Sequence, residues 1–365
     1  MEGLPPSAPI SCDTMVEVSD YESLKQLKER NRNRAFLAVS GTAAVFFASF
    51  LGCMVIGNYP MTIPQALMAI FGQGDDNMII YTVQQVRLPR IIAASVVGAA
   101  LSIAGLTMQS LFKNPMASPS ILGISSGASL GASLAISFGI GSVIFGQYAT
   151  SAMACIMCFV TLLLVYMIAR SRYGVNTVTL LLAGVAVGAF FNSIVSMLQY
   201  IADENTLASI IYWTMGSFNK VTWDSLSTSS VLLILGIISQ ALIYRELNLI
   251  SAGEEQAANL GVNVKFVRYV CLIGTALCVG GAVSIAGTIG FVGLIVPHIF
   301  RMIIGPNHKL LIPMCIAGGA AFLLLMDTLA KMAFIASFPV GVFTSLLGAP
   351  FFIFILKRRK KEMWE

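Results

Sequence analysis

Long apolar runs separated by short polar turns dominate the chain between Ala35 and Leu356. Each run is about 20 residues long, which lets a helix cross a bilayer core of about 30 Å. Short alternating segments, which are typical of transmembrane barrels, are not the pattern here. We therefore predict an all-α membrane protein with about ten transmembrane helices. They are expected near residues 35–57, 88–111, 119–140, 143–169, 176–201, 224–244, 265–286, 289–304, 310–336 and 339–356.

Polar segments flank this membrane region at both ends. Residues 1–34 have no apolar core, so we expect a solvated, partly disordered tail and not a cleavable signal. Residues 35–356 form the predicted transmembrane domain, and residues 357–365 a basic tail. The composition agrees, because only 11% of the residues are charged and the mean hydropathy is +0.83. Soluble domains carry roughly 25% charged residues.

The placement of charge predicts how the chain crosses the membrane. A net charge of +5 alone is compatible with a nucleic-acid partner. With the N-terminal tail in the cytoplasm, however, the predicted spans leave only Arg87, Arg90, Lys220 and Lys331 of the 22 basic residues outside. The opposite threading would violate the positive-inside rule. We expect a multi-pass protein of the cytoplasmic membrane, with both termini in the cytoplasm, the lipid bilayer as its surroundings and no nucleic-acid partner.

Two arginines open the second predicted span from the outer face. Arg87 and Arg90 are three residues apart and share one face of the helix start. Cations at a helix N-terminus oppose the helix dipole, and these two also run against the positive-inside trend. The pair indicates either a negatively charged partner or simple snorkelling to the interface.

A second charged pair lies in the ninth span. Asp327 and Lys331 are four residues apart within an apolar run, so they can neutralise each other as a local ion pair. An ionisable residue inside a membrane is nevertheless a candidate functional residue. Both interpretations stay open at this point.

Small residues and prolines predict close packing and rigid turns. Gly123, Gly127 and Gly131 repeat every four residues in the third span, and Gly184 and Gly188 repeat the spacing in the fifth. This pattern lets helix backbones approach closely, so we expect packing as its role. Asn114-Pro115 and Ser118-Pro119 form a stiff turn before the third span, because the residue before proline avoids helix. That turn and its counterpart, residues 173–179, are either gates or ordinary turns.

The polar loop at residues 246–262 points to a partner on the inner face. Residues 252–260 are predicted to form a short helix that Gly261 ends in the left-handed conformation. So short a helix is marginal by itself, which favours a docked cytoplasmic surface.

The chain carries no recognisable catalytic or metal-binding motif. It has no Walker A sequence and no HExxH or GxSxG motif. Cys155 and Cys158 lie in an apolar span, where cysteine behaves as a small hydrophobic residue. His298 and His308 are interpreted as structural. We expect no enzyme activity, no metal and no cofactor bound by this chain.

Several motifs together resemble the permease family of ABC importers for ferric siderophores, haem and cobalamin. The resemblance covers about residues 81–356 and rests on RLPR (87–90), GAALSIAGLTMQSLFKNPMASPSILGISSGAS (98–129), LLLAGVAVG (180–188), GEEQAANLGV (253–262), GTIGFVGLIVPHIFRMIIG (287–305) and PVGVFTSLLGAPFFIFIL (339–356). It implies a type II ABC importer permease fold and a pair of permease subunits. It also implies an ATPase dimer below, which binds ATP and Mg, and an extracytoplasmic substrate-binding protein above.

The resemblance also implies roles for individual residues. It implies that Arg87, Arg90 and Lys331 contact the binding protein. At the position of Lys331 the family often has arginine. The cytoplasmic gate falls on Asn114, Met116 and Thr177. ATPase coupling, through a helix at about 252–261, falls on Gly253, Glu254, Glu255, Ala257, Leu260 and Gly261. Ser337 departs from the glutamate that is common there, and Phe338 from an aliphatic residue.

The sequence predicts the transported substrate less precisely than it predicts the type of transporter. We expect an iron chelate, either a ferric siderophore or haem, with cobalamin as the alternative. The permease pair is expected to be a homodimer, with a heterodimer also open. A secondary transporter would need midplane carboxylates on broken helices, whereas the only acid well inside a span is Asp327. An intramembrane enzyme would need paired catalytic groups.

Overall fold

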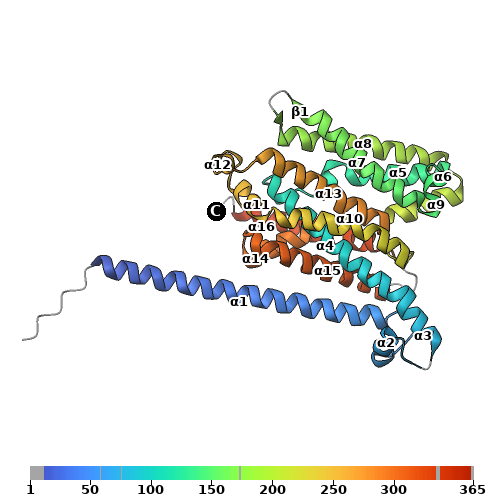
Figure 1. The fold of residues 1–365 in the computed structure, drawn as a ribbon, viewed down its shortest axis with the longest axis horizontal. Coiled ribbons are helices and arrows are strands. Elements are labelled where there is room, and N and C mark those ends of the chain that lie inside the picture. Colours follow the sequence, from blue (N-terminus) through green and yellow to red (C-terminus); the bar gives the residue numbers. More distant parts are fainter. Residues whose placement is uncertain (1–11, 58, 75, 172–173, 334–337, 363–365) are drawn as a thin grey trace, which may run out of the picture.

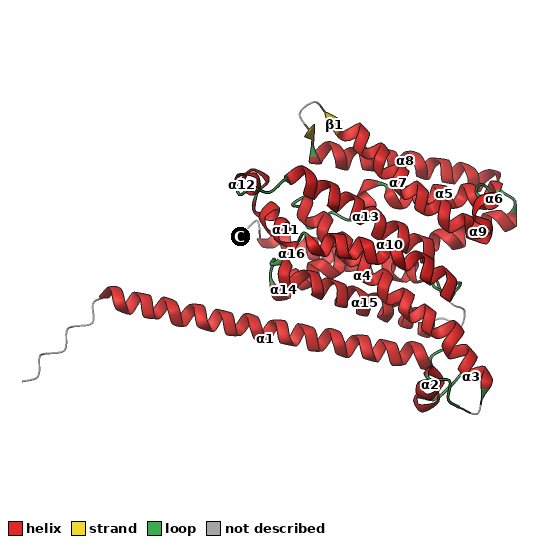
Figure 2. Cartoon of the chain, in the orientation of Figure 1, coloured by secondary structure: helices red, strands yellow, loops and turns green. Residues whose placement is uncertain are grey.

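The computed structural model describes residues 12–362 except 58, 75, 172–173 and 334–337. The described part is a helical bundle with one short strand pair, β1 (Arg170–Ser171) with β2 (Gly174–Val175) (Figures 1 and 2). One end of the bundle carries α11, α12, β1 and the C-terminus, and we call it the α12 end (Figure 1). The opposite end carries α2 and α3, and we call it the α3 end (Figure 1).

The helices follow the apolar runs of the sequence. Their bounds are α1 Cys12–Val55, α2 Ile63–Ile70, α3 Asn77–Tyr81, the π-helix η1 Thr82–Arg87, α4 Leu88–Leu111, the 3₁₀-helix η2 Pro119–Leu122, α5 Ile124–Phe138, α6 Ser142–Phe145, the 3₁₀-helix η3 Gly146–Tyr148, α7 Ala149–Ala169, α8 Thr177–Ile201, α9 Glu204–Met215, α10 Trp223–Leu242, α11 Tyr244–Ala252, α12 Glu254–Asn259, α13 Val264–Ala286, α14 Val292–Ile304, α15 His308–Ala333 and α16 Val340–Glu362.

The predicted spans correspond to helices of the structure. Within the described residues, 7 helices are long and apolar enough to cross a membrane. The shorter apolar helices Ile124–Phe138, Val292–Ile304 and Val340–Ile353 occupy the three predicted spans that remain. The number of apolar helices is therefore consistent with the predicted ten transmembrane helices. The eighth span, Val292–Ile304, is short, as expected.

Several span ends differ from the prediction. The second span begins at Asn77 and not at Leu88, because α3 and η1 continue into α4. The third begins at Ile124, because Gly123 adopts a left-handed φ of 72° and interrupts the helix. The helix α9, Glu204–Met215, was not predicted at all.

The first and last helices extend into the expected tails. Residues 12–34 were predicted to be partly disordered, but α1 includes them without a break up to Val55. No glycine or proline interrupts the sequence from Cys12 to Ser40, and extending an existing helix adds one hydrogen bond per residue. Similarly, α16 continues through the basic segment to Glu362. The boundaries at residues 34 and 357 are therefore not helix ends.

The helix α4 lies inside the bundle and packs against α10, α13, α14 and α15 (Figure 1). A Cβ atom on Gly105 would overlap the backbone of Gly293 in α14, and one on Gly98 would overlap the carbonyl of Gly319 in α15. Lipid provides no hydrophobic drive between helices, so such close contacts supply the packing energy. Small residues thus hold the centre of the structure.

The glycine repeats noted in the sequence perform this role in a second group of helices, α5, α7 and α8. A Cβ on Gly127 or Gly131 would collide with α7, at Thr161 and Met153 respectively. Gly123 lies against Gly184 and Gly188 of α8. The predicted packing role of both repeats is confirmed.

Gly105→Ala is expected to destabilise the protein by about 1–3 kcal/mol, because the added methyl has no space against Gly293. The measurement is the thermal unfolding midpoint in detergent. Gly41→Ala in α1 is the matched control, since a Cβ there meets nothing within 4 Å. Equal midpoints for the two variants would contradict the packing argument.

Candidate functional site

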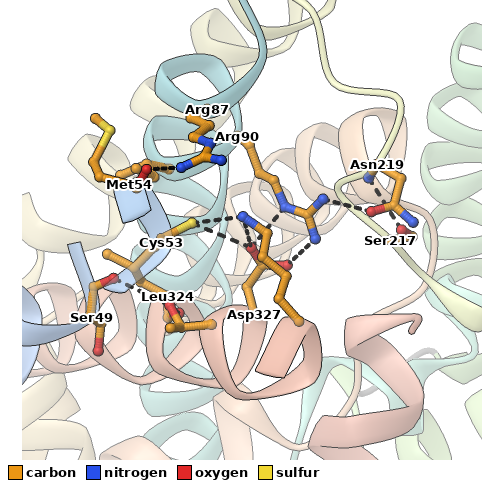
Figure 3. Close-up of polar contacts among 12 residues, drawn as sticks. Ser49, Cys53, Met54, Arg87, Arg90, Ser217, Asn219, Leu324 and Asp327 are labelled. Carbon is orange, nitrogen blue, oxygen red and sulfur yellow. Dashed lines mark hydrogen bonds and ion pairs between the residues drawn. The ribbon is translucent and has the colours of Figure 1, made fainter. Parts of the chain in front are cut away.

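A cluster of polar side chains at the α3 end joins α1, α4 and α15 (Figure 3). We call it the arginine cluster and define it as Cys53, Arg87, Arg90, Asn219, Asp327 and Lys331. The guanidinium of Arg90 donates from Nε to Oδ2 of Asp327 and from Nη2 to Oδ1, both at 2.8 Å. It also donates from Nη1 to Oδ1 of Asn219 at 2.6 Å. Because the Asp327 side chain is fully buried, this paired-fork geometry is shielded from solvent.

The other two cations of the cluster attach α1 to the same place. Arg87 donates from Nη1 to the carbonyl of Met54 and from Nη2 to the carbonyl of Tyr59, the latter at 2.6 Å. Lys331 Nζ lies 2.9 Å from Cys53 Sγ and 3.8 Å from Asp327 Oδ2. Arg90 and Lys331 therefore share the Asp327 carboxylate, while Arg87 bonds to backbone carbonyls, and the cluster keeps an excess of positive charge.

The segment that supplies the Tyr59 carbonyl is itself held in place. The Tyr59 hydroxyl donates to Asp76 Oδ2 at 2.9 Å, and Asp76 Oδ1 accepts the backbone N–H of Met78 at 2.8 Å. Asp76 thereby caps α3. The Met78 N–H and then the Tyr59 hydroxyl lower the pKa of Asp76, because both hydrogen bonds favour the carboxylate.

The structure brings the three predicted docking residues together but does not leave them on the surface. Arg87 and Arg90 are only 5% and 8% exposed. The negative partner that the sequence indicated is supplied within the chain by Asp327, whose short contacts are to Arg90 and not to the neighbouring Lys331. No pattern in the sequence marked this pairing, because it depends on the contact between Gly98 of α4 and Gly319 of α15, from which Arg90 and Asp327 are equally distant along their helices.

The predicted gate residues lie in two turns. After α4, Lys113 has a positive φ of 48°, and the Asn114 N–H donates to the Gln109 carbonyl at 3.1 Å. Oδ1 of Asn114 then accepts the N–H of Met116 at 2.9 Å. Met116 itself is 38% exposed. Thr177 is the first residue of α8. It follows Asn176, whose side chain caps the helix by accepting from the N–H of Val178 at 2.8 Å.

The predicted coupling helix is divided in two. The expected helix over 252–261 is α12, Glu254–Asn259, and Gly253 separates it from α11. Gly261 has a φ of 87°, so its predicted left-handed stop is confirmed. Ala257 is buried, whereas Glu255 and Leu260 are exposed, Leu260 by 68%. The segment thus presents a mixed apolar and acidic surface at the α12 end.

A cavity of about 450 Å³ lies between the start of α5, the end of α9 and the start of α16. Among the described residues, its wall consists of the hydroxyl side chains Ser118, Ser120, Ser125, Thr214, Thr288 and Ser345 together with Gly, Ala, Val, Leu, Ile, Met, Pro and Phe residues, without a charged side chain. The segment 287–291 between α13 and α14 forms part of the wall, and Phe291 has a positive φ of 67° there. Irregular backbone at membrane depth is tolerated where it lines such a space.

The arrangement offers charge, hydrogen bonds and a neutral cavity. In the part of the chain that the structure describes, no three His, Cys, Asp or Glu residues gather as a metal site would require. His308, which was interpreted from the sequence as structural, is 2% exposed and contacts two other helices through Ser110 and Asn248. No pattern in the sequence marked that contact.

Known relatives are similar over most of this chain. The hemin transport system permease protein HmuU of Yersinia pestis is 40% identical over 76% of this chain and 83% of its own length. The cobalamin import system permease protein BtuC of Halobacterium salinarum is 39% identical over 89% of this chain and 86% of its own length. The molybdate import system permease protein MolB of Haemophilus influenzae is 36% identical, with 84% and 91% covered.

Solved structures share the fold. A metal-chelate type ABC transporter in an inward-facing conformation has a TM-score of 0.77 and 34% identity, over 87% of this chain and 98% of that chain. PsaBC from Streptococcus pneumoniae has a TM-score of 0.53 at 16% identity, which supports the fold alone. Residues 44–358, which include the arginine cluster, both turns and α12, match the family model. The chain therefore has a type II ABC importer permease fold and belongs to the FecCD transport family.

Proposed function

We propose that this chain is the permease subunit of an ABC importer that moves an iron chelate, a ferric siderophore or haem, across the cytoplasmic membrane into the cell. The observation that carries the proposal is the family match over residues 44–358, nearly the whole membrane region. The hemin permease relative and the metal-chelate type structure support the cargo class. Cobalamin is the second candidate, because a cobalamin permease is 39% identical.

The neutral cavity supports a path that encloses cargo without holding it tightly. Its wall has hydroxyl, glycine and apolar side chains, and charged groups are absent from its lining. Conduction requires binding that is weak enough for release, and such a wall satisfies that requirement. We assign selective capture to an extracytoplasmic binding protein. A second permease subunit, a homodimer partner in the simplest case, would complete the path.

The α12 end is assigned to the cytoplasm. This orientation places Arg245, Lys265, Arg268 and Lys309 inside, in agreement with the positive-inside rule. The exposed Leu260 and Glu255 then face a separate ATPase dimer. That dimer, and not this chain, would bind ATP and Mg²⁺. Asn114, Met116 and Thr177 would form the inner gate, which moves when the ATPase moves the coupling segment.

The arginine cluster is proposed to guide an acidic binding protein to the α3 end. Its excess positive charge supports this role, because complementary charge raises association rates even where side chains are partly enclosed. The contact between Arg90 and Asp327 also argues against ion-coupled secondary transport. A carboxylate engaged at 2.8 Å by a guanidinium is unsuited to exchange protons or sodium in each cycle.

Nucleotide dependence tests the transport proposal. In proteoliposomes that contain this chain, its ATPase and its binding protein, ATP is expected to drive accumulation of ⁵⁵Fe-ferrichrome or haemin. The chain reconstituted alone should accumulate neither, since its sequence has no Walker A motif. Cyanocobalamin is the third probe, and preferential uptake of it would support the second candidate. Uptake by the chain alone under a proton gradient would contradict the ABC importer assignment.

Charge at the α3 end tests docking. Lys331→Gln is expected to slow binding-protein association several-fold and weaken its salt dependence, because it removes a positive charge while leaving the Arg90–Asp327 pair intact. Lys220→Gln, an exposed lysine outside the cluster, is the control and should have a smaller effect. Association is measured by surface plasmon resonance at two salt concentrations. Identical rates for both variants and the parent chain would remove the docking role.

A further inference from the structure

Two polar bridges connect the helices α11 and α12, which we call the coupling segment (244–259), to the two turns at the α12 end. Each bridge passes through one side chain that belongs to a different helix. Arg268 of α13 forms one bridge, and His308 of α15 forms the other. The inference that follows rests on the proposed function, in which an ATPase moves the coupling segment.

The first bridge joins α12 to the turn before α8. Nη2 of Arg268 donates to both carboxylate oxygens of Glu254, at 3.0 and 3.1 Å, and Nη1 donates to the carbonyl of Val175 at 2.9 Å. Val175 immediately precedes Asn176, which caps α8, and Thr177, which begins it. A single planar guanidinium therefore spans from the coupling segment to the turn, and its side chain is only 12% exposed.

The second bridge joins α11 to α4. Oδ1 of Asn248 accepts the backbone N–H of His308 at 2.9 Å and lies 2.8 Å from its Nδ1. An amide oxygen only accepts, so Nδ1 carries the proton. In the neutral ring Nε2 is then the acceptor, and the single proton of the Ser110 hydroxyl is shared between this Nε2 at 2.6 Å and the Leu106 carbonyl at 2.9 Å. The His308 side chain therefore links Ser110 of α4 to Asn248 of α11.

Ser110 leads directly to the other turn. It lies in the last turn of α4, which ends at Leu111. The backbone N–H of Asn114 donates to the carbonyl of Gln109, the residue before Ser110, at 3.1 Å. Asn114 in turn holds the N–H of Met116 at 2.9 Å. Hydrogen bonds thus connect the turn to the last turn of α4, so that Ser110 and Met116 belong to one hydrogen-bonded segment.

We propose that Arg268 and His308 are positioning residues that transmit movement of the coupling segment to the two turns separately. Arg268 acts on the turn that carries Thr177, and His308, through Ser110, acts on the turn that carries Met116. Arg268 joins α13 to α12 and to the Val175 carbonyl of β2, and His308 joins α15 to α4 and α11. The Arg268 side chain is 12% exposed and His308 is 2% exposed. The hydrogen bonds within the Asn114 turn and the cap of α8 by Asn176 are local and involve neither side chain, whereas the Val175 carbonyl accepts from Arg268.

Thiol labelling tests this division. Thr177→Cys and Met116→Cys serve as reporters in the nanodisc-reconstituted complex with its ATPase, and a membrane-impermeant maleimide measures labelling rates with and without ATP plus vanadate. Labelling of the chain without a reporter is subtracted. Arg268→Gln is expected to abolish the nucleotide response of Cys at 177 and to keep that at 116. Ser110→Ala should give the reverse pattern, with ATP hydrolysis retained in both.

Matched controls separate transmission from general damage. Lys265→Gln changes an exposed cation near Arg268 on α13, and Ser95→Ala removes a hydroxyl of α4 that bonds only to the Ile91 carbonyl. Both should keep the two responses. If Ser110→Ala does not assemble, Asn248→Ala cuts the same bridge at its other end and should give the same loss.

Each remaining outcome has one meaning. If either bridge variant keeps both responses, or loses both while its melting temperature is unchanged, separate transmission is wrong. If the parent complex hydrolyses ATP but shows no nucleotide response at either reporter, the proposed gate itself fails and the bridges have nothing to transmit. If the complex neither assembles with an ATPase nor responds to ATP, the importer assignment fails.

Discussion

The close packing of α4 against α13, α14 and α15 is the interaction on which the rest of the structure depends. Lipid is as apolar as the helices, so association relies on backbone approach at small residues. Gly98 and Gly105 permit that approach, since any side chain there would overlap α15 or α14. The helix α4 is thereby fixed along its length. Both regions that we connect with function lie at its ends.

At the α3 end this packing creates the conditions for a buried ion pair. Arg90 and Asp327 meet because α4 and α15 are in register around the Gly98–Gly319 contact. Removing either partner would leave an uncompensated charge in a low-dielectric place, which is typically more costly than the pair is stabilising. The pair therefore specifies how the helices align, while Arg87 extends the same alignment to α1 through the Met54 carbonyl. The excess positive charge therefore acts on a partner through its electrostatic potential, because the arginine side chains themselves are buried.

At the α12 end the polar contacts are of another kind. They connect the short helices of the coupling segment to α13 and α15 and, through these, to the turn before α8 and to the end of α4. A rigid membrane core with polar connections at one end suits a subunit that receives movement instead of generating it. The neutral cavity between the two ends fits the same assignment, because cargo passing through it meets no charge that would retain it. Structure and family membership thus favour a passive path whose work is done by partners.

Much of this protein was determined by local features of its sequence. The apolar runs specify the membrane helices, because a bilayer of about 30 Å requires about 20 apolar residues wherever a helix crosses it. The glycine repeats likewise specify which helix faces another backbone can approach closely, and Gly261 specifies where α12 ends, since both depend on residues near one another in the sequence.

The tertiary structure alone decided which charges meet. Asp327 has Lys331 four residues away, yet its short contacts are to Arg90 of another helix. The bonds of His308 to Ser110 and Asn248 likewise depend on three helices far apart in sequence. Sequence spacing reports neighbours along one helix, whereas the partner of a buried polar group is set by the crossing of two helices and the register between them.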